Sequence, residues 1–242
     1  MFTAMCMIVQ LCSFRAVRVA EKKAARHAGH RAGQPQGRGW KDDVIQPPGS
    51  RGGAGRSRQE QAGAGRVALA DTDPQGGLSA WFNARAAETP VFVDVGAGLP
   101  AAITACREDG IDVLIVDTPP SITATIALVV AHANLVVVPV RPSPNDLRAV
   151  GGTVELVARA KKPLVFVVNQ VTPRARITAE AAIALSQHGT VAPSMLASRI
   201  DFATSMTDGR TAGELDLSSR SAFEVSALWA YLATRLNGAV ND

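Results

Sequence analysis

Two stretches of the sequence decide its fold: Val67-Ala-Leu-Ala-Asp71-Thr-Asp73-Pro-Gln75 and Val113-Leu-Ile-Val-Asp117-Thr-Pro-Pro120. Each is a short apolar run that ends in aspartate, as expected of a strand buried in a parallel sheet with both faces covered. The carboxyl ends of parallel strands meet at one edge of a sheet. We therefore expect Asp71, Asp73 and Asp117 to gather at that edge.

Beyond residue 65, short apolar runs alternate with segments of helical periodicity. The expected strands are 67–70, 91–95, 113–116, 135–140 and 164–168, and the expected helices are 78–87, 100–108, 122–132, 145–160, 177–187 and 221–236. This alternation is typical of βα units. It predicts an α/β fold with a doubly wound, mostly parallel sheet and helices on both faces.

The charge divides the chain into two parts. Residues 1–66 carry 12 Lys or Arg and 4 Asp or Glu, whereas residues 67–242 carry 13 and 17. The mildly acidic second part gives no global argument for nucleic-acid binding. Residues 21–65 show no sustained helical or strand period and are rich in Gly, Arg, Gln and Pro. We expect 1–64 to be a basic, irregular segment of low order and 65–242 to be the α/β domain.

Cysteine spacing and apolar segments argue against several classes of protein. The three cysteines, Cys6, Cys12 and Cys106, have neither metal-ligand nor disulfide-framework spacing, which indicates ordinary reduced thiols. No window reaches the roughly 18 uninterrupted apolar residues of a membrane span. Basic residues follow the apolar N-terminus, whereas a secretory signal has them in front. We therefore expect a cytoplasmic protein.

The strand-end aspartates suit a magnesium site. Mg²⁺ is usually held by one or two carboxylates together with waters and phosphate oxygens. Asp117 ends a buried strand and suits binding through water, whereas Asp73 lies in a turn closed by Pro74 and is better placed to orient a water. Aspartates after strands also commonly serve as turn or helix-cap residues. Two such motifs in this order favour phosphate-transfer chemistry.

A family resemblance rests on several motifs that follow one another in a specific order. They are Gly65-Arg-Val-Ala-Leu-Ala-Asp-Thr-Asp-Pro-Gln-Gly76 with Ser79-Ala-Trp81, Asp112-Val-Leu-Ile-Val-Asp-Thr-Pro-Pro-Ser121, Ala133-Asn-Leu-Val-Val-Val-Pro-Val-Arg-Pro-Ser-Pro-Asn-Asp-Leu147 and Val165-Phe-Val-Val-Asn-Gln170. Over roughly 65–236 the chain resembles the ParA/MinD group of deviant P-loop ATPases, and most closely the plasmid and chromosome partition (ParA) proteins.

The resemblance implies a P-loop fold that uses ATP and Mg²⁺. It implies that Asp73 helps to position the hydrolytic water and that Asp117 binds Mg²⁺ through water. It also implies that Asp71 belongs to the cofactor site and that Asn169, at the end of a strand, hydrogen-bonds the adenine. Taken without the family, Asn169 is as well explained as a helix or turn cap.

The function implied by the resemblance is a nucleotide-dependent dimer switch that binds DNA non-specifically and supports plasmid or chromosome segregation. Its partners would be a second copy in a homodimer, non-specific DNA and a partition protein that stimulates hydrolysis, and its location would be cytoplasmic and nucleoid-associated. We expect no membrane association, because 221–236 carries Arg235 as its only cation, whereas a MinD-like membrane helix is rich in Lys.

Two other classes of function stay open. One is a non-hydrolysing, degenerate homologue that acts as a binding module, in which the basic arm Arg51–Arg66 contacts nucleic acid electrostatically. The other is a metabolic ATPase of the same fold, because a fold does not determine a function.

The phosphate loop that the family requires is missing. The family places a Lys-Gly-Gly-x-Gly-Lys-Thr loop about thirty residues before Asp71, and Gln36-Gly-Arg-Gly-Trp-Lys-Asp-Asp43 stands there instead. Trp40 would block the approach of the phosphates, and Asp42 and Asp43 would repel them. The chain as written is therefore predicted to bind ATP weakly or not at all.

Our hypothesis for the missing loop is a reading-frame error, which the coding DNA can test. We expect that residues from 27 to about 60 are translated out of frame. When the codons of Gln34–Val44 are read one nucleotide further on, they can spell Asn-Pro-Lys-Gly-Gly-Ala-Gly-Lys-Thr-Thr-Leu, an intact family loop. One position is forced, because Trp40 followed by Lys41 must become Gly. The same shift at 27–28 can give a start codon followed by an apolar, strand-like stretch.

Overall fold

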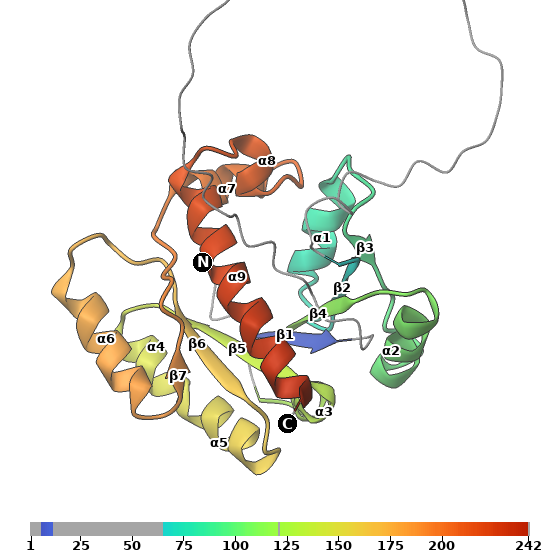
Figure 1. Cartoon of the computed structure of the whole chain (residues 1–242), viewed down its shortest axis with the longest axis horizontal. Helices are drawn as coiled ribbons and strands as arrows, with labels where there is room; N and C mark the ends of the chain where they lie inside the picture. Colours follow the sequence, from blue (N-terminus) through green and yellow to red (C-terminus); the bar gives the residue numbers. More distant parts are fainter. Residues whose placement is uncertain (1–5, 12–64, 121, 242) are drawn as a thin grey trace, which may run out of the picture.

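A computed structural model gives the structure of the chain, and it describes Cys6–Leu11 and residues 65–120 and 122–241 (Figure 1). The phosphate-loop window 34–44 and most of the basic segment lie outside the described residues. The predictions made for them therefore stay predictions.

In the part of the chain that the structure describes, seven strands form one sheet in the order β3-β2-β4-β1-β5-β6-β7. The strands are β1 (Cys6–Leu11), β2 (Val67–Asp71), β3 (Val91–Phe92), β4 (Val113–Thr118), β5 (Leu135–Val140), β6 (Leu164–Val168) and β7 (Thr190–Val191). The β2–β3, β2–β4, β5–β6 and β6–β7 pairs are all parallel. The predicted α/β fold with a mostly parallel sheet is confirmed.

Helices cover both faces of this sheet. They are α1 (Gly77–Ala84), α2 (Leu99–Glu108), α3 (Ala124–His132), α4 (Pro144–Ala149), α5 (Gly151–Arg159), α6 (Arg176–Ser186), α7 (Ile200–Ser205), α8 (Ala212–Leu215) and α9 (Arg220–Asn241). Successive strand residues point to opposite faces. Val136 of β5 accordingly packs in a core shared with α2, α3, α5 and α6, whereas Val137 packs against α9. Figure 1 shows α9 lying across its face of the sheet.

One predicted helix is two helices in the structure. The segment 145–160 was expected to be continuous, but it divides into α4 and α5 at the buried Val150. Gly151 and Gly152 follow this break, and glycine is a poor helix former because it loses more backbone entropy than other residues. The hydrophobic periodicity of the segment is unaffected by the break and therefore did not reveal it.

β1 is an element that the sequence did not predict, and its direction matters for the site. It lies between β4 and β5 and is antiparallel to both. Met7 is paired with Asp117, whereas Leu11 is paired with Val113 at the other end of β4. The strand therefore begins at the edge of the sheet that carries Asp117 and ends at the opposite edge. A strand that delivers a phosphate loop to the aspartates has to run the other way.

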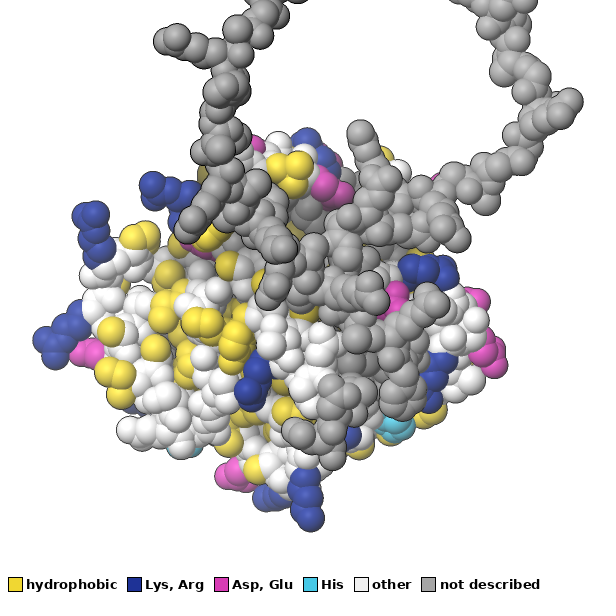
Figure 2. All heavy atoms as spheres, viewed as in Figure 1, with side chains coloured by type: hydrophobic (Ala, Val, Ile, Leu, Met, Phe, Trp, Pro, Cys, Tyr) yellow, Lys and Arg dark blue, Asp and Glu magenta, His cyan; other side chains and the backbone are white. Residues whose placement is uncertain are grey.

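The surface of the described residues is mixed in character. On the face shown in Figure 2, the Lys and Arg side chains of these residues stand apart from one another rather than in one continuous patch, and apolar side chains gather beside α9. Among the described residues, no helix has both the length and the apolar character needed to cross a membrane.

Candidate functional site

The aspartates of the two opening motifs meet at one edge of the sheet. Asp71 ends β2, and it is paired in register with Asp117 of the neighbouring strand β4. Thr72 continues the contact, since its backbone N–H and its hydroxyl both donate to the carbonyl oxygen of Asp117, at 2.9 and 2.7 Å. The parallel β2–β4 ladder thus places two carboxylates side by side.

Asp117 is a buried carboxylate without full compensation. Its side chain belongs to a residue that is only 3% exposed, and Oδ1 has no hydrogen-bond partner among the described residues. Burial raises the pKa of Asp117 to about 7, and the charges of Asp71 and Asp73 add to that rise, while a backbone hydrogen bond from Thr118 opposes it. A buried anion of this kind is costly unless a cation or further donors reach it.

Asp71 has both of its carboxylate oxygens engaged within the loop that it begins. Oδ1 accepts the backbone N–H of Asp73 at 3.0 Å, and Oδ2 accepts the backbone N–H and the hydroxyl of Ser79, each at 2.9 Å. Gly76, at the N-cap position of α1, has no capping side chain. Asp71 therefore takes the role of an N-cap from the end of β2. The structure places it as a positioning residue for the loop and for α1.

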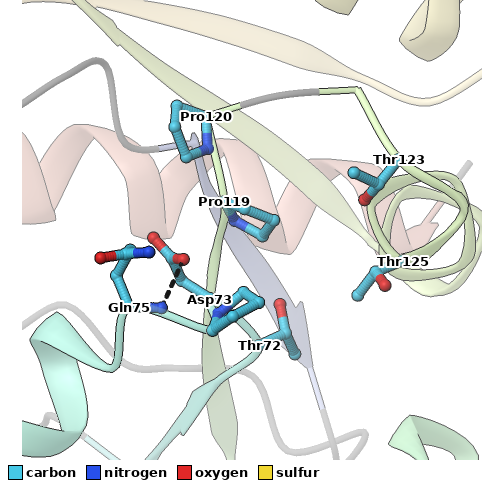
Figure 3. A pocket seen from close by; sticks show the side chains of 8 residues that line it. Thr72, Asp73, Gln75, Pro119, Pro120, Thr123 and Thr125 are labelled. Carbon is cyan, nitrogen blue, oxygen red and sulfur yellow. Dashed lines mark hydrogen bonds between the residues drawn. The ribbon is translucent and has the colours of Figure 1, made fainter.

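Asp73 lies at the tip of the same loop, where its Oδ1 accepts the backbone N–H of Gln75 at 2.9 Å. It borders two adjoining open hollows of about 330 and 360 Å³. Figure 3 shows Asp73 and Gln75 on one side of the first hollow and Thr123 and Thr125, at the start of α3, on the other. Asp73 thus borders a space that is large enough for a water or a small ligand.

The chemistry of these hollows fits a hydrated cation better than a bare phosphate. The described residues that line both hollows include aspartate and threonine but neither Lys nor Arg. Among the described residues, no group of three or more His, Cys, Asp or Glu side chains is placed to hold a metal ion. Mg²⁺ does not need such a group, since it commonly keeps several waters and binds through one or two carboxylates. The uncompensated oxygen of Asp117 lies at the same edge of the sheet, but Asp117 is not among the described residues that line the two hollows.

Asn169 lies at the same edge of the sheet but away from the aspartates. Its backbone N–H donates to Val140 at 2.9 Å, and its side-chain oxygen accepts the N–H of Gln170 at 2.8 Å. β1 and β5 separate β6 from β4. With neighbouring strands about 4.8 Å apart, this is a lateral distance of about 14 Å. Asn169 and Asp117 would therefore contact different ends of an extended ligand.

Ser79 and Thr72 were not assigned a role from the sequence. Their contacts are with a carboxylate and a carbonyl at the ends of neighbouring strands. A serine in the first turn of a helix that follows a strand-end aspartate is a weak signal for such a contact. The hydrogen bond from the hydroxyl of Thr72 to the carbonyl oxygen of Asp117 depends on the pairing of β2 with β4, which the sequence alone does not specify.

The comparisons with known proteins agree with a ParA-like scaffold. No protein-family model matches the chain. The chain is similar to the maintenance of carboxysome distribution protein A of Halothiobacillus neapolitanus, with 29% identity over 168 residues, which is 65% of this chain and 78% of that protein. It is also similar to the protein of the same name from Gloeobacter kilaueensis, with 37% identity over 100 residues, which is 40% of this chain and 44% of that protein.

These similarities support the ParA-like resemblance in its general form. Neither of the two relatives is named as a plasmid or chromosome partition protein, so they do not support the finer expectation that the chain is most similar to that subgroup. The findings support a resemblance to the ParA/MinD-type ATPases in general. This support comes from the strand-end aspartates, the parallel sheet and the two relatives.

Proposed function

We propose that this chain derives from a ParA-type positioning ATPase, which distributes a large cargo in the cell through ATP-dependent dimerisation and non-specific binding to DNA. The observation that carries the proposal is the in-register pair Asp71 and Asp117, with a buried oxygen of Asp117 left without a partner among the described residues. The names of the relatives make carboxysomes one candidate cargo, beside the plasmid or chromosome expected from the resemblance.

In this proposal each residue of the edge has a separate task. Asp117 accepts a hydrogen bond from a water of the magnesium ion, which when bound neutralises charge on the phosphates. Asp73 orients the attacking water from the loop tip, and Asp71 holds that loop through the N–H of Asp73. Asn169 contacts the adenine at a distance of about 14 Å along the sheet edge.

The proposed partners are a second copy of the chain, nucleoid DNA and a protein that stimulates hydrolysis. Support for DNA binding comes from the family resemblance. The face in Figure 2 adds none, since the described Lys and Arg side chains on it stand apart and form no continuous basic patch. A cytoplasmic, nucleoid-associated location belongs to the same proposal.

We also propose that the phosphate-binding half of the site was lost to the frame error within 27–60. Two features support this. β1 runs away from the aspartate edge, and no basic side chain is found among the described residues that line the two hollows. The lack of basic side chains also favours the alternative function, a non-hydrolysing homologue that retains the fold as a binding module. The frame-error hypothesis requires that the coding DNA still spells the phosphate loop in another frame, whereas the binding-module hypothesis does not.

We expect this chain to show no binding of Mg²⁺-ATP in calorimetry at millimolar nucleotide, because its sequence lacks the glycine-rich loop that would hold the phosphates. A variant whose codons in this window are read one nucleotide further on is expected to bind Mg²⁺-ATP with a Kd in the range of about 1 μM to 1 mM. It is also expected to become dimeric on ATP addition, as measured by light scattering.

The control is the same restored variant with Asp117→Asn, which should lose the magnesium dependence of binding. Micromolar binding of ATP by the unrestored chain would contradict the loss of the phosphate-binding half. If the coding DNA cannot spell the loop in another frame, the frame error is excluded and the binding-module alternative gains.

A further inference from the structure

Helix α1 is attached to the rest of the molecule by polar contacts at its two ends and by a half-buried apolar face. None of its residues, Gly77–Ala84, is buried. At its N-terminal end, the carboxylate of Asp71 receives the backbone N–H and the hydroxyl of Ser79. Its apolar side chains Leu78, Trp81 and Phe82 are half-buried, and the ring of Phe82 lies 4.9 Å from that of Phe92 in β3. Because this face is only half-buried, the polar contacts at the two ends contribute substantially to fixing the position of the helix.

The C-terminal end of α1 is held by Arg85, whose side chain is only 5% exposed. Nε of Arg85 donates to the carbonyl oxygen of Thr89 at 2.6 Å, and Nη1 donates to that of Gly209 at 2.7 Å. Both terminal nitrogens also donate to the carboxylate of Glu214, one of them at 2.8 Å. This forked arrangement has a narrow geometry, so it transmits a displacement of either partner.

A hydrogen bond and a close approach of the two backbones also join this end of α1 to the segment 209–214, and a cation–π contact joins Trp81 to Arg85 within that end. The indole N–H of Trp81 donates to the carbonyl oxygen of Arg210 at 3.1 Å, and the guanidinium of Arg85 lies 5.3 Å from the centre of the Trp81 ring. Gly209, with φ of +74°, lies so close that an added Cβ would come within 2.4 Å of the backbone of Arg85. The two segments are in direct contact and leave no room between them.

Glu214 continues the connection into α8. Its carboxylate accepts the backbone N–H of Thr211 at 2.7 Å, and the hydroxyl of Thr211 accepts the N–H of Glu214 at 3.2 Å, which makes a capping box. The same carboxylate therefore binds Arg85 and fixes the start of α8. A continuous set of polar contacts runs from Asp71 through α1 to α8, and Figure 1 shows these helices as neighbours.

We propose that α1 is a connecting lever, which couples the conformation of the aspartate loop 71–75 to that of the α7–α8 segment. The surface beyond the lever carries exposed apolar residues, with Ile200 77% and Leu217 88% exposed, so a shift of α8 changes what this surface presents. The coupling is a property of the chain's own contacts and does not depend on the proposed ATPase function.

Hydrogen exchange followed by mass spectrometry on the full chain tests this coupling. Asp71 has two side-chain oxygens that accept hydrogen bonds, one from Asp73 and the other from Ser79. Asp71→Asn leaves a single accepting oxygen for both residues. We expect exchange to become on the order of tenfold faster for the amides of 209–215 as well as for those of 77–84. The substitution also removes the repulsion between the carboxylates of Asp71 and Asp117, and this effect alone would stabilise the chain and slow exchange. Faster exchange in both 77–84 and 209–215 would therefore result from the lost hydrogen bonds.

The reciprocal variant is Arg85→Lys, which keeps the charge but removes the fork. Because coupling between two sites is reciprocal, it should accelerate exchange in 72–79 by a similar factor. The matched control is Arg176→Ala, which removes an exposed ion pair with Glu180 on α6 and should change neither segment.

The lever is refuted if Asp71→Asn accelerates only α1 and Arg85→Lys accelerates only 209–215. If either variant loses its far-ultraviolet circular dichroism spectrum, Ser79→Ala and Glu214→Gln carry the same test from the two ends. Their expected outcome is again faster exchange at the end that was not altered.

Discussion

Replacing Asp117 by Asn is expected to stabilise the nucleotide-free chain at pH 7.5 by about 2 to 4 kcal/mol, which is the free-energy equivalent of most of a pKa rise from 3.8 to about 7. The rise is caused first by burial and then by the charge of Asp71. Asparagine has the same shape without the charge. The native state then no longer has to bury an ionised group.

The pH dependence gives this prediction its sign. The folded pKa of Asp117 lies above its unfolded value, so below about pH 4 the carboxyl group is protonated in both states and costs nothing. Between about pH 4 and 7 the unfolded chain releases the proton while the native state keeps it, and native stability falls. The advantage of Asp117→Asn should therefore grow over this interval and level off above about pH 7, the value given for the folded group.

Urea unfolding at several pH values measures this difference. Asp94→Asn is the matched control, because Asp94 is exposed and its side chain accepts the N–H of Gly96 within its own turn. It is expected to change stability by less than about 0.5 kcal/mol. A stability of Asp117→Asn equal to or below that of the unaltered chain at pH 7.5 would show that donors outside the described residues already compensate the carboxylate.

Arg85→Ala is expected to destabilise the chain by about 2 to 3 kcal/mol. The substitution leaves the carbonyl oxygens of Thr89 and Gly209 and the carboxylate of Glu214 without their donor. The side chain of Glu214 is 42% exposed, so water replaces part of the lost interaction and the cost stays below that of a fully buried pair.

Acid should remove much of this effect. The hydrogen bond from Arg85 is the main reason that the pKa of Glu214 falls from 4.5 to about 2. For a carboxyl group with a lowered folded pKa, the stabilisation is present above about pH 4.5 and disappears as the pH falls towards 2. The difference between the unaltered chain and Arg85→Ala should shrink over that interval in thermal unfolding curves.

Arg159→Ala provides the comparison for an ordinary ion pair, because Arg159 and Glu155 are 80% and 70% exposed. Its expected cost is below about 0.5 kcal/mol. If Arg85→Ala were as mild as this control, the contacts of Arg85 would contribute little to holding α1 against 209–214.

Much of the sheet was predictable from the sequence because its strands are buried on both faces. Leu135–Val140 and Leu164–Val168 have the predicted bounds, since an unbroken apolar run between polar residues leaves little freedom for a strand to begin elsewhere. β1 escaped prediction although it has six residues, whereas other elements that escaped prediction are short. α8 has four residues and β7 has two, so neither is long enough to show a period.

The site was predictable as a set of residue types but not as a set of contacts. The positions of Asp71 and Asp117 after apolar runs predicted that both lie at one edge. The engagement of both Asp71 oxygens by Asp73 and Ser79 depends on the path of the loop, and the missing partner of Asp117 depends on what surrounds β4. Sequence periodicity contains no information on either.

The central position of β1 has a consequence for the order in which the chain folds. β4 and β5 are not paired with each other, and Met7 of β1 is paired with Asp117 and with Val137, which are 110 and 130 residues further along the chain. Contacts between such distant residues form slowly, because a large loop has to close before they contribute. The half-sheets β3-β2-β4 and β5-β6-β7 have far more local connections. They become one hydrogen-bonded sheet only after Cys6–Leu11 has docked between them.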